Sequence, residues 1–404
     1  MYNNVIFQLD GSIVSDAIIS KFDLRAHSRN LRYSSRVKAD VLDFVGFVIK
    51  DDNILVVLPK HYTDPARIPL LNDSDMALLF KTLLKKQINY NLDYIGEMEY
   101  FESSYPFNAF FEVYKYFKNY GLYHETNTII KPGNNGKISW KDTIRKSQVI
   151  INEKNVIFSP LYIKRNYTEE VFLTECMAYV INKTIRVFSS FINLKSVQNI
   201  NIHEEAFENK DYVVSKLRVI ATRLFKDKEK KLIKALIEYF ENKNQGGNIV
   251  FKHYNFELVW ESVVNEFLNK HLSGIKDGFP NFDLENRNIK RNFSKGRFYI
   301  NNSNGNHRIE PDHYYIDGDN QYILDSKYYT SLSNIDYKQI AYNTILRSQV
   351  DGETYNALFL PTHEKINSSL YFDLNESYYN DKGIKIIATY LTVKDSMEVY
   401  VASN

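Results

Sequence analysis

The segment 309–327 constrains the fold of this chain more than any other. Two runs rich in aromatic and aliphatic residues, 313–316 and 321–324, flank the polar sequence Asp317-Gly318-Asp319-Asn320. Short runs of this kind joined by a polar turn with glycine are typical of a β-hairpin. The chain is therefore expected to contain a small sheet in its last third, with this hairpin as part of it.

Acidic and basic side chains mark the ends of this hairpin. Asp312 opens the first strand, and Asp325 and Lys327 lie two positions apart at the end of the second strand. Because successive side chains of a strand point to opposite faces, Asp325 and Lys327 are expected on one face and Ser326 on the other. The competing interpretation is structural: Asp312 only begins a strand, and Asp325 and Lys327 form a solvated ion pair of little energetic value.

Two carboxylates and a lysine are the groups that metal-assisted phosphodiester hydrolysis requires. Mg²⁺ prefers carboxylate oxygens and keeps several water molecules, and it lowers the pKa of a bound water. Asp312 and Asp325 are the predicted ligands, with the backbone carbonyl of Ser326 as a further one. Lys327 is expected to orient or deprotonate the attacking water, or to hold the scissile phosphate. Mn²⁺ is expected to substitute for Mg²⁺.

The arrangement resembles the PD-(D/E)xK nuclease superfamily, whose motif is matched by Pro311-Asp312 and by Asp325-Ser326-Lys327. The resemblance implies a helix with an acidic residue before the hairpin. A helix is predicted over about 255–271, and Glu261 is the expected third carboxylate, acting in catalysis and metal binding. Glu257 is the alternative, and an exposed helix glutamate without a role is the competing interpretation.

A helix predicted near 334–348 carries Gln339 and Tyr342, which lie three positions apart and so share one face. This spacing resembles a helix motif found in many nucleases of the same superfamily. Both residues are expected to support the site, and ordinary helix residues are the alternative.

A basic loop at 290–297 precedes the hairpin. It contains four basic residues and the aromatic Phe293. Basic groups beside the proposed site suit contact with phosphates, although a solvated loop is an equally simple interpretation. The DNA-contact candidates are Lys290, Arg291, Lys295 and Arg297. The histidines of this region form no ligand pattern, and a lone histidine is more often packed or hydrogen-bonded than bound to metal. They are His253, His271, His307 and His313.

The length of 404 residues exceeds the usual size of one hydrophobic core and predicts a multidomain α/β protein. An N-terminal mixed α+β region is expected over 1–165 and a helical middle over 166–245. A C-terminal PD-(D/E)xK restriction-endonuclease-like α/β domain is expected over 246–404. The last boundary lies at Gln245-Gly246-Gly247-Asn248, a cluster that ends the helical pattern.

Local patterns predict further elements along the chain. In the first two regions we expect a hairpin at 45–58, a helix after Asp73 and a helix after Pro106 that ends at Gly121. Strands are expected near 147–151 and 156–163. A helix over 168–187, with Glu169 and Glu170 in its first turn, and a helical zone over 211–242, broken near 226–230, follow them. Those of the last region are strands near 297–301, 355–360, 368–373 and 383–391.

Beyond the nuclease motif, the chain resembles the LlaJI-type restriction endonucleases, which are relatives of McrC. Three pieces carry this resemblance in the order that the family has them. They are 45–62, then 136–146 with its following strands, then 259–261 together with Pro311-Asp312 and 325–329.

The resemblance implies a division of labour between two proteins. Such subunits work with a McrB-like AAA+ NTPase, a GTPase in the McrBC case, that recognises and translocates DNA. The N-terminal part contacts the NTPase ring and the C-terminal domain cuts. The sequence has no GxxxxGK[ST] phosphate loop, so the chain is expected to bind no nucleotide itself. Candidate contact segments are 45–58 and 138–146, the latter with Arg145 and Lys146, and ordinary core or surface residues are the alternative.

Composition narrows the classes of function. The formal net charge is only +2, which favours a local DNA groove or a grip shared with a partner over a wholly basic surface. Cys176 is the only cysteine, which excludes an internal disulfide and a cysteine zinc cluster. No apolar run of membrane-spanning length occurs and the first residues lack a signal-peptide pattern, so a cytoplasmic protein without a membrane span is expected.

The main hypothesis is therefore a Mg²⁺-dependent endonuclease subunit of an NTP-dependent, McrBC/LlaJI-like restriction system of type II or IV character. It would hydrolyse double-stranded DNA in defence against phage or other foreign DNA, and a nuclease-domain dimer would serve to cut both strands. One alternative is a non-catalytic adaptor that regulates an AAA+ NTPase ring. Another is a repair or RNA nuclease of the same superfamily.

Overall fold

The hairpin expected at 45–58 forms and lies within a five-stranded mixed sheet. In spatial order the strands are β1 (Asn4–Leu9), β5 (Asn53–Leu58), β4 (Val45–Lys50), β12 (Ile249–His253) and β6 (Phe101–Ser103). In this computed structural model, β1 runs parallel to β5 and the other neighbours are antiparallel. Nearly every side chain of β4 and β5 is buried, so the hairpin is core. The expectation that it offers a contact surface to a partner is wrong.

The chain folds into two compact units. The first consists of Met1–Tyr105 together with Asn244–Asn404, and the second is Pro106–Lys243. The boundary expected near 245 coincides with the end of the second unit, whereas the limit expected at 165 falls inside the strand β11 (Tyr162–Glu169). The structure describes residues 4–51, 53–93, 100–152, 155–169, 171–188, 194–200, 202, 204–242, 249–285, 289–301, 307–329, 332, 337–378 and 383–403.

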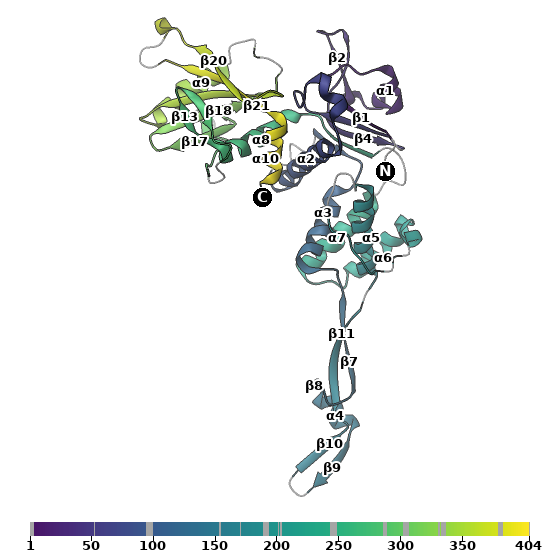
Figure 1. Cartoon of the computed structure of the whole chain (residues 1–404). Helices are drawn as coiled ribbons and strands as arrows, with labels where there is room; N and C mark the ends of the chain where they lie inside the picture. The colour runs from purple at the N-terminus through teal and green to yellow at the C-terminus, as the bar shows by residue number, and fades with distance from the viewer. Residues whose placement is uncertain are drawn as a thin grey trace. The chain divides into compact units, whose positions relative to one another are not determined.

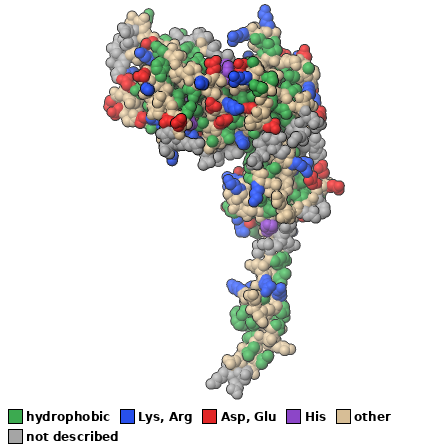
Figure 2. Space-filling model, viewed as in Figure 1, with side chains coloured by type: hydrophobic (Ala, Val, Ile, Leu, Met, Phe, Trp, Pro, Cys, Tyr) green, Lys and Arg blue, Asp and Glu red, His purple; other side chains and the backbone are tan. Residues whose placement is uncertain are grey.

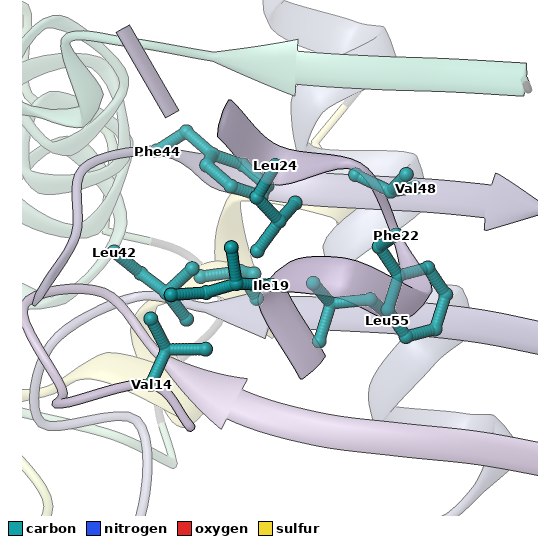
Figure 3. Close-up of a cluster of buried hydrophobic side chains, with 9 residues drawn as sticks. Val14, Ile19, Phe22, Leu24, Leu42, Phe44, Val48 and Leu55 are labelled. Atoms are coloured by element: carbon teal, nitrogen blue, oxygen red, sulfur yellow. The ribbon is translucent and has the colours of Figure 1, made fainter. Parts of the chain in front are cut away.

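A cluster of buried apolar side chains covers one face of the first sheet (Figure 3). It includes residues of α1 (Asp16–Lys21), the strand β3 (Ala39–Leu42) and the sheet itself, and β3 pairs with β2 (Leu31–Ser34). Its buried members are Val14, Ile19, Phe22, Leu24, Leu42, Phe44, Val48, Leu55 and Val57. Fully burying one such large side chain contributes roughly 1.5–3 kcal/mol. The cluster therefore anchors the N-terminal segment to the sheet.

The opposite face of this sheet packs against α2 (Asp73–Asp93), the helix expected after Asp73. Phe47 precedes Val48 on β4, so its side chain points to the opposite face of the sheet. Its ring centroid lies 6.1 Å from that of Phe80 on the helix. The Phe80 ring lies 5.1 Å from that of Phe251 on β12. Helix, strand and hairpin are thus held together by one aromatic cluster.

β12 belongs to this first sheet although it opens the segment expected to be the nuclease domain. It pairs antiparallel with β4 on one side and with β6 on the other. Its close approach to β4 depends on Gly46, because an added Cβ there would lie 2.1 Å from the carbonyl oxygen of Phe251. The last third of the chain therefore completes a sheet that the first third begins.

A second five-stranded sheet contains the hairpin predicted from 309–327. Its strands are, in spatial order, β17 (His313–Asp317), β18 (Asn320–Ser326), β19 (Thr354–Thr362), β21 (Lys385–Thr392) and β20 (Asn367–Asp373). The three central strands are parallel, and each outer strand is antiparallel to its neighbour. These strands confirm those expected near 355–360, 368–373 and 383–391.

Helices pack on both faces of this second sheet. α8 (Phe256–His271), which confirms the helix expected over 255–271, places the fully buried Trp260 so that its Nε1–H donates to the Phe359 carbonyl at 3.3 Å. On the other face α9 (Tyr337–Leu346) packs Tyr342 and Leu346 against Ile323 of β18. The arrangement is a mixed α/β fold, as expected.

Several elements of this unit were not predicted. In its last part they include α10 (Val393–Ala402) and the short strands β13 (Leu272–Lys276), β14 (Phe279–Phe282) and β16 (Arg308–Ile309), and in the rest of the unit β1, β2, β3, β6, β12 and α1 were not predicted either. β15 (Phe298–Tyr299) confirms the strand expected near 297–301. In the part of the chain that the structure describes, no helix has the length and apolar character needed to cross a membrane.

The second unit begins as a helical bundle. Its helices are α3 (Phe107–Tyr120), α5 (Phe172–Val187), α6 (Lys210–Ala221) and α7 (Asp227–Asn242). The helix expected after Pro106 ends where predicted, because Gly121 adopts a φ of 75° and its N–H caps Phe117 at 2.9 Å. The zone expected over 211–242 is divided as predicted, but the break lies at 222–226, and 227–230, expected to be part of it, belongs to α7.

From this bundle a β-arm extends, formed mainly by β7 and β11 (Figure 1). Its elements are β7 (Glu125–Pro132), β8 (Lys137–Ile138), α4 (Trp140–Lys146), β9 (Gln148–Asn152), β10 (Asn155–Ser159) and β11. The helix expected from 168 starts only at Phe172, because β11 continues its pairing with β7 up to Glu169. Glu169 is therefore a strand residue, and Glu170 lies outside the described residues.

Candidate active site

The end of β18 and the start of β17 are tied together by one hydrogen bond. The Ser326 N–H donates to Asp312 Oδ2 at 3.0 Å, just beyond the last ladder pair, His313 with Leu324. Since the N–H and C=O of one antiparallel-strand residue point to the same side, the Ser326 carbonyl also lies on the Asp312 side of β18. The segment brings the groups together as the motif spacing predicts.

Asp325 is a buried carboxylate held between two lysines. Its side chain is 1% exposed, and Lys327 Nζ lies 2.6 Å from its Oδ2 while Lys338 Nζ lies 3.4 Å from its Oδ1. Burial raises the pKa of Asp325, and the Asp312 carboxyl, which is within hydrogen-bonding reach, raises it further. The two lysines lower it. The aspartates therefore lie on the same side of the fold and share one electrostatic environment.

Lys338 was missed by sequence reasoning. It lies on α9 directly before Gln339, and burial opposes its charge while Asp325 and Asp312 raise its pKa. One sequence signal was available: Gln339 was expected on a helix beside the site. A residue next to Gln339 on that helix can therefore also reach the strand that carries Asp325. Nothing in the sequence, however, indicated which neighbour turns toward Asp325.

Glu261 joins the aspartates from α8. Its pKa is raised to about 7, first by burial and then by the Asp312 carboxylate, while Lys295 and Lys86 oppose the increase. Lys295 Nζ lies 3.8 Å from Glu261 Oε2. Of the two glutamates considered on this helix, Glu261 is the one with this electrostatic contact to Asp312.

The donor set can be compared with what a divalent ion requires. Among the described residues, no group of three or more His, Cys, Asp and Glu side chains is arranged closely enough to hold a metal ion by itself. Mg²⁺ does not need such a cage, because it is usually bound through one or two carboxylates together with water and substrate phosphate. The Asp312 and Asp325 pair, with mutual repulsion that a cation would relieve, fits an ion of this kind.

Gln339 and Tyr342 lie behind the carboxylates and contact backbone. The Gln339 amide donates to the Ile323 carbonyl at 2.5 Å, and the Tyr342 hydroxyl donates to the Glu310 carbonyl at 2.9 Å. These bonds attach α9 to β18 and to the segment that leads into Asp312. Both residues thus occupy positions from which they can support the site.

The basic loop divides into residues with different surroundings. Arg291 donates to the carbonyls of Leu272 and Ser273, at 2.7 Å each, and to Asp317 at 2.5 Å. Its guanidinium is thereby engaged within the protein, and the expected DNA contact of Arg291 stays a prediction. Among the other three candidates, Lys290 is exposed, Lys295 lies beside Glu261, and Arg297 lies 3.4 Å from Glu310.

The histidines follow the structural interpretation. His313 is 1% exposed and its ring contacts Asn265 and Ser326, and burial lowers its pKa to about 3, so it is neutral. His253 is also buried, and His271 contacts the Asp283 carbonyl at 3.1 Å. The role of His313 beside the site was not predicted.

The expected partner-contact residues lie on the arm of the second unit. Arg145 and Lys146 end α4 and are exposed. Lys146 Nζ also lies 3.3 Å from Asp142 and 5.3 Å from the centre of the Tyr162 ring. Arg145 is thus accessible, whereas Lys146 has partners within the arm.

Comparison with known proteins gives one family. The family model of the LlaJI restriction endonuclease matches residues 44–393. No curated protein matches. One similar solved structure is a chain of the refined half-complex from a tetradecameric assembly of Thermococcus gammatolerans McrB AAA+ hexamers with bound McrC. It is 13% identical, with 98% of each chain covered and a TM-score of 0.39. Another is the cryo-EM structure of the Thermococcus gammatolerans McrBC complex, 12% identical, with 64% of this chain and 84% of that chain covered and a TM-score of 0.24.

Proposed function

The chain belongs to the LlaJI restriction endonuclease family, and we propose that it is the Mg²⁺-dependent, DNA-cutting subunit of an NTP-dependent restriction system. In this proposal its last third is a PD-(D/E)xK nuclease, double-stranded DNA is the substrate, and foreign DNA such as that of phage is the target. The family match supports a restriction nuclease, and the geometry below supports the type of chemistry.

One observation carries the proposal: three acidic side chains from separate elements act on one another. Asp312 precedes β17, Asp325 ends β18, and Glu261 comes from α8, yet Asp312 raises the pKa of both others. Carboxylates repel one another and are costly to bury together, even where ammonium groups lie beside them. A site of this kind is explained by a cation that the working protein binds, which is why the arrangement supports metal-dependent hydrolysis.

Asp312, Asp325 and the Ser326 carbonyl would hold the ion, with Glu261 reaching it directly or through water. Mg²⁺, or Mn²⁺ in its place, would neutralise charge on the phosphate and acidify a water molecule.

The chain's own residues supply positioning and proton transfer. Lys327 Nζ lies 2.6 Å from Asp325, so a water or phosphate oxygen that approaches this carboxylate also meets an ammonium group. Lys338 adds a second positive charge on the α9 side. Glu261, with a pKa of about 7 in the metal-free protein, can accept or release a proton near neutral pH.

Duplex DNA would approach over the basic loop. Lys290, Lys295 and Arg297 are the proposed phosphate contacts. Lys295 connects this surface to the site, because its ammonium group lies 3.8 Å from Glu261. A nuclease-domain dimer, one domain for each strand, remains part of the proposal.

The arm of the second unit is the proposed contact with a McrB-like AAA+ NTPase. Figure 2 shows apolar side chains along the arm, which soluble proteins rarely leave uncovered over a large area. The exposed ones on α4, β9 and β10 are Trp140, Ile144, Val149, Ile150, Ile151, Val156 and Ile157. Arg145 lies among them on α4 and would add a charged contact. The NTPase identity of the partner rests on the sequence resemblance.

Cleavage of supercoiled plasmid tests the proposal. The purified chain, its NTPase partner, Mg²⁺ and NTP are expected to produce linear DNA, and Asp325→Ala is expected to abolish cutting while DNA binding persists. Asp319→Ala serves as a matched control, because Asp319 is exposed in the turn of the same hairpin. Full cleavage by the Asp325 variant would refute the proposal.

The same assay separates the alternatives. Stimulation of the partner's NTP hydrolysis without any cutting would favour a regulatory adaptor. Preference for flap DNA or RNA over duplex DNA would favour a repair or RNA nuclease.

A further inference from the structure

A chain of hydrogen bonds through two buried side chains leads from α8 to the Asp312 carboxylate. It begins on α8, where Asn265 Oδ1 lies 3.1 Å from His313 Nδ1. The other ring nitrogen, His313 Nε2, lies 2.7 Å from Ser326 Oγ. The Ser326 N–H then donates to Asp312 Oδ2 at 3.0 Å. His313 and Ser326 are 1% and 2% exposed, so the bond between them is buried, whereas the bonds to Asn265 and Asp312 are partly buried.

Each member of the chain lies next to one of the acidic residues. Asn265 follows Glu261 by four positions, one turn along the same helix face. His313 directly follows Asp312, and Ser326 directly follows Asp325. The network thus connects the three elements that supply the carboxylates, and it meets β18 on the face opposite to the Asp325 side chain.

Each ring nitrogen of His313 faces one polar side chain. With the Asn265 oxygen toward the ring, as in this structure, His313 donates through Nδ1–H. The neutral ring then has a lone pair at Nε2, which accepts the Ser326 hydroxyl proton. The ring therefore works as a rigid spacer with a donor at one end and an acceptor at the other, and it holds Ser326 in one rotamer.

An apolar side chain would fill this space without the need for satisfied polar partners. Buried polar networks are worth more than packing only when every member is satisfied, and then they specify one arrangement. A role in stability alone would not explain why the network ends on the residue between Asp325 and Lys327. Its position points to a role in geometry.

We propose that the Asn265–His313–Ser326 chain sets the relative positions of Glu261, Asp312, Asp325 and the Ser326 carbonyl for a divalent ion, with His313 as its central positioning residue. The inference rests on the proposed function, because it assigns an ion to these carboxylates. His313 itself touches neither ion nor substrate. It acts through Ser326, as residues behind metal ligands do when they fix ligand orientation.

Calorimetric titration of the full chain with Mn²⁺, without DNA, tests this role. His313→Phe and Ser326→Ala are each expected to weaken Mn²⁺ binding by about 10- to 100-fold, the usual effect of removing a residue that orients ligands. The double variant is expected to be no weaker than the weaker single one, because both act through the same contact. His307→Ala is the matched control, since His307 is exposed and bonds to Asn301 instead.

Thermal unfolding separates positioning from stability. The double variant leaves no unpaired group between His313 and Ser326, so it is expected to recover stability relative to His313→Phe. Its Mn²⁺ affinity is expected to stay low. If His313→Phe fails to fold, Ser326→Ala carries the test, because it removes only a hydroxyl.

The outcomes distinguish this inference from the proposed function. Unchanged Mn²⁺ affinity in Ser326→Ala and in the folded His313 variant, with normal cleavage by the wild type, would overturn the inference and leave the function standing. Affinity that returns together with stability in the double variant would also overturn it. A wild-type chain that binds no divalent ion and cuts no DNA would refute the proposed function, and the inference with it.

Discussion

The carboxylate of Asp325 is the residue on which the site's electrostatics depend. A charged group that is only 1% exposed loses most of its hydration, and the loss is offset here by ammonium groups on both oxygens. One of them, Lys327, is itself 11% exposed, whereas Lys338 is 47% exposed. In the metal-free protein these lysines supply the positive charge beside Asp325 that a divalent ion would otherwise provide.

Lys338→Met is expected to destabilise the metal-free protein and to tighten its hold on divalent ions. Asp325 loses one of its two partners, which costs about 1 kcal/mol for a half-exposed charged contact. The same change removes a cation that competes with metal for Asp325. Thermal unfolding with and without Mn²⁺ measures both effects. Unchanged stability together with weaker ion binding would contradict this reading of Lys338.

Glu261 is expected to make both stability and ion binding depend on pH. Its pKa rises from an ordinary 4.5 to about 7 in the folded protein, chiefly by burial. The stability contributed by the protonated carboxyl is fully present below pH 4.5 and is lost as pH rises through about 7. Divalent ion affinity should change in the opposite direction, because the ion requires the deprotonated form.

Comparison of the wild type with Glu261→Gln isolates this group from the other titrating residues. The free energy of unfolding is expected to fall between pH 4.5 and about 7 more steeply in the wild type than in the variant. Parallel pH profiles for the two proteins would show that Glu261 keeps an ordinary pKa.

For single residues, the sequence predicts a shared position when the residues are close together on one strand or helix. Asp325 and Lys327 share a face because strand side chains alternate, and that rule needs no tertiary information. Asn265, His313 and Lys338 depend on how α8 and α9 pack on the sheet, which no local pattern reveals. The internal contacts of Arg291 were missed for the same reason: its guanidinium contacts carbonyls of β13, a strand that the sequence did not predict.

At the scale of elements, close approach of two backbones limits which residue Gly46 can be. Its φ of 145° lies in a region that favours glycine, and the paired strand β12 lies close beside it. Because a Cβ would meet the Phe251 carbonyl oxygen at 2.1 Å, any other residue must push β4 and β12 apart. The union of the first and last thirds of the chain depends on this position.

Gly46→Ala is therefore expected to lower the free energy of unfolding by about 3 kcal/mol or more, through forced separation of paired strands. Gly278→Ala is the control, because its φ of 84° is also unfavourable for alanine but nothing lies within 4 Å of the added Cβ. The control should lose only about 1–2 kcal/mol. Chemical denaturation measures both, and equal losses would show that β12 does not press on β4.

Elements with strong local patterns were predicted, and those that depend on distant pairing were not. The hairpins at 45–58 and 313–326 and the helices α3 and α8 follow from alternation and capping. β12 finds its partners some 200 residues away in sequence, at β4, and a run of five residues carries no sign of that. The strand expected over 156–163 is instead two strands, since Pro160 has no N–H to continue the ladder.

At the scale of the whole molecule, the arm explains why an apparently ordinary composition includes so much exposed apolar surface. Ile144 and Ile151 are 61% and 75% exposed on the arm. Burial of such side chains against a partner would contribute to binding. The sequence indicated the segment 138–146 as a contact region, but its presentation on a β-arm could not be predicted, because β7 and β11 pair across about 30 intervening residues.

Ile144→Asp combined with Ile151→Asp is expected to abolish association with the proposed NTPase partner and to leave the unfolding temperature unchanged. The reason is that both side chains are exposed and contribute little to the core. Phe225→Asp, which changes a side chain 80% exposed between α6 and α7 of the bundle and not on an element of the arm, should leave association intact. Size-exclusion chromatography with the partner measures this, and a stable complex of the double variant would contradict it.

A cation shared by Asp312 and Asp325 is tested most directly by Mn²⁺ titration of Asp312→Asn, Asp325→Asn and the double variant. If both carboxylates hold one ion, each single change removes most of the binding and the double change adds little further loss. Two independent losses that add together, or full affinity in either single variant, would mean that the two aspartates do not form one metal site.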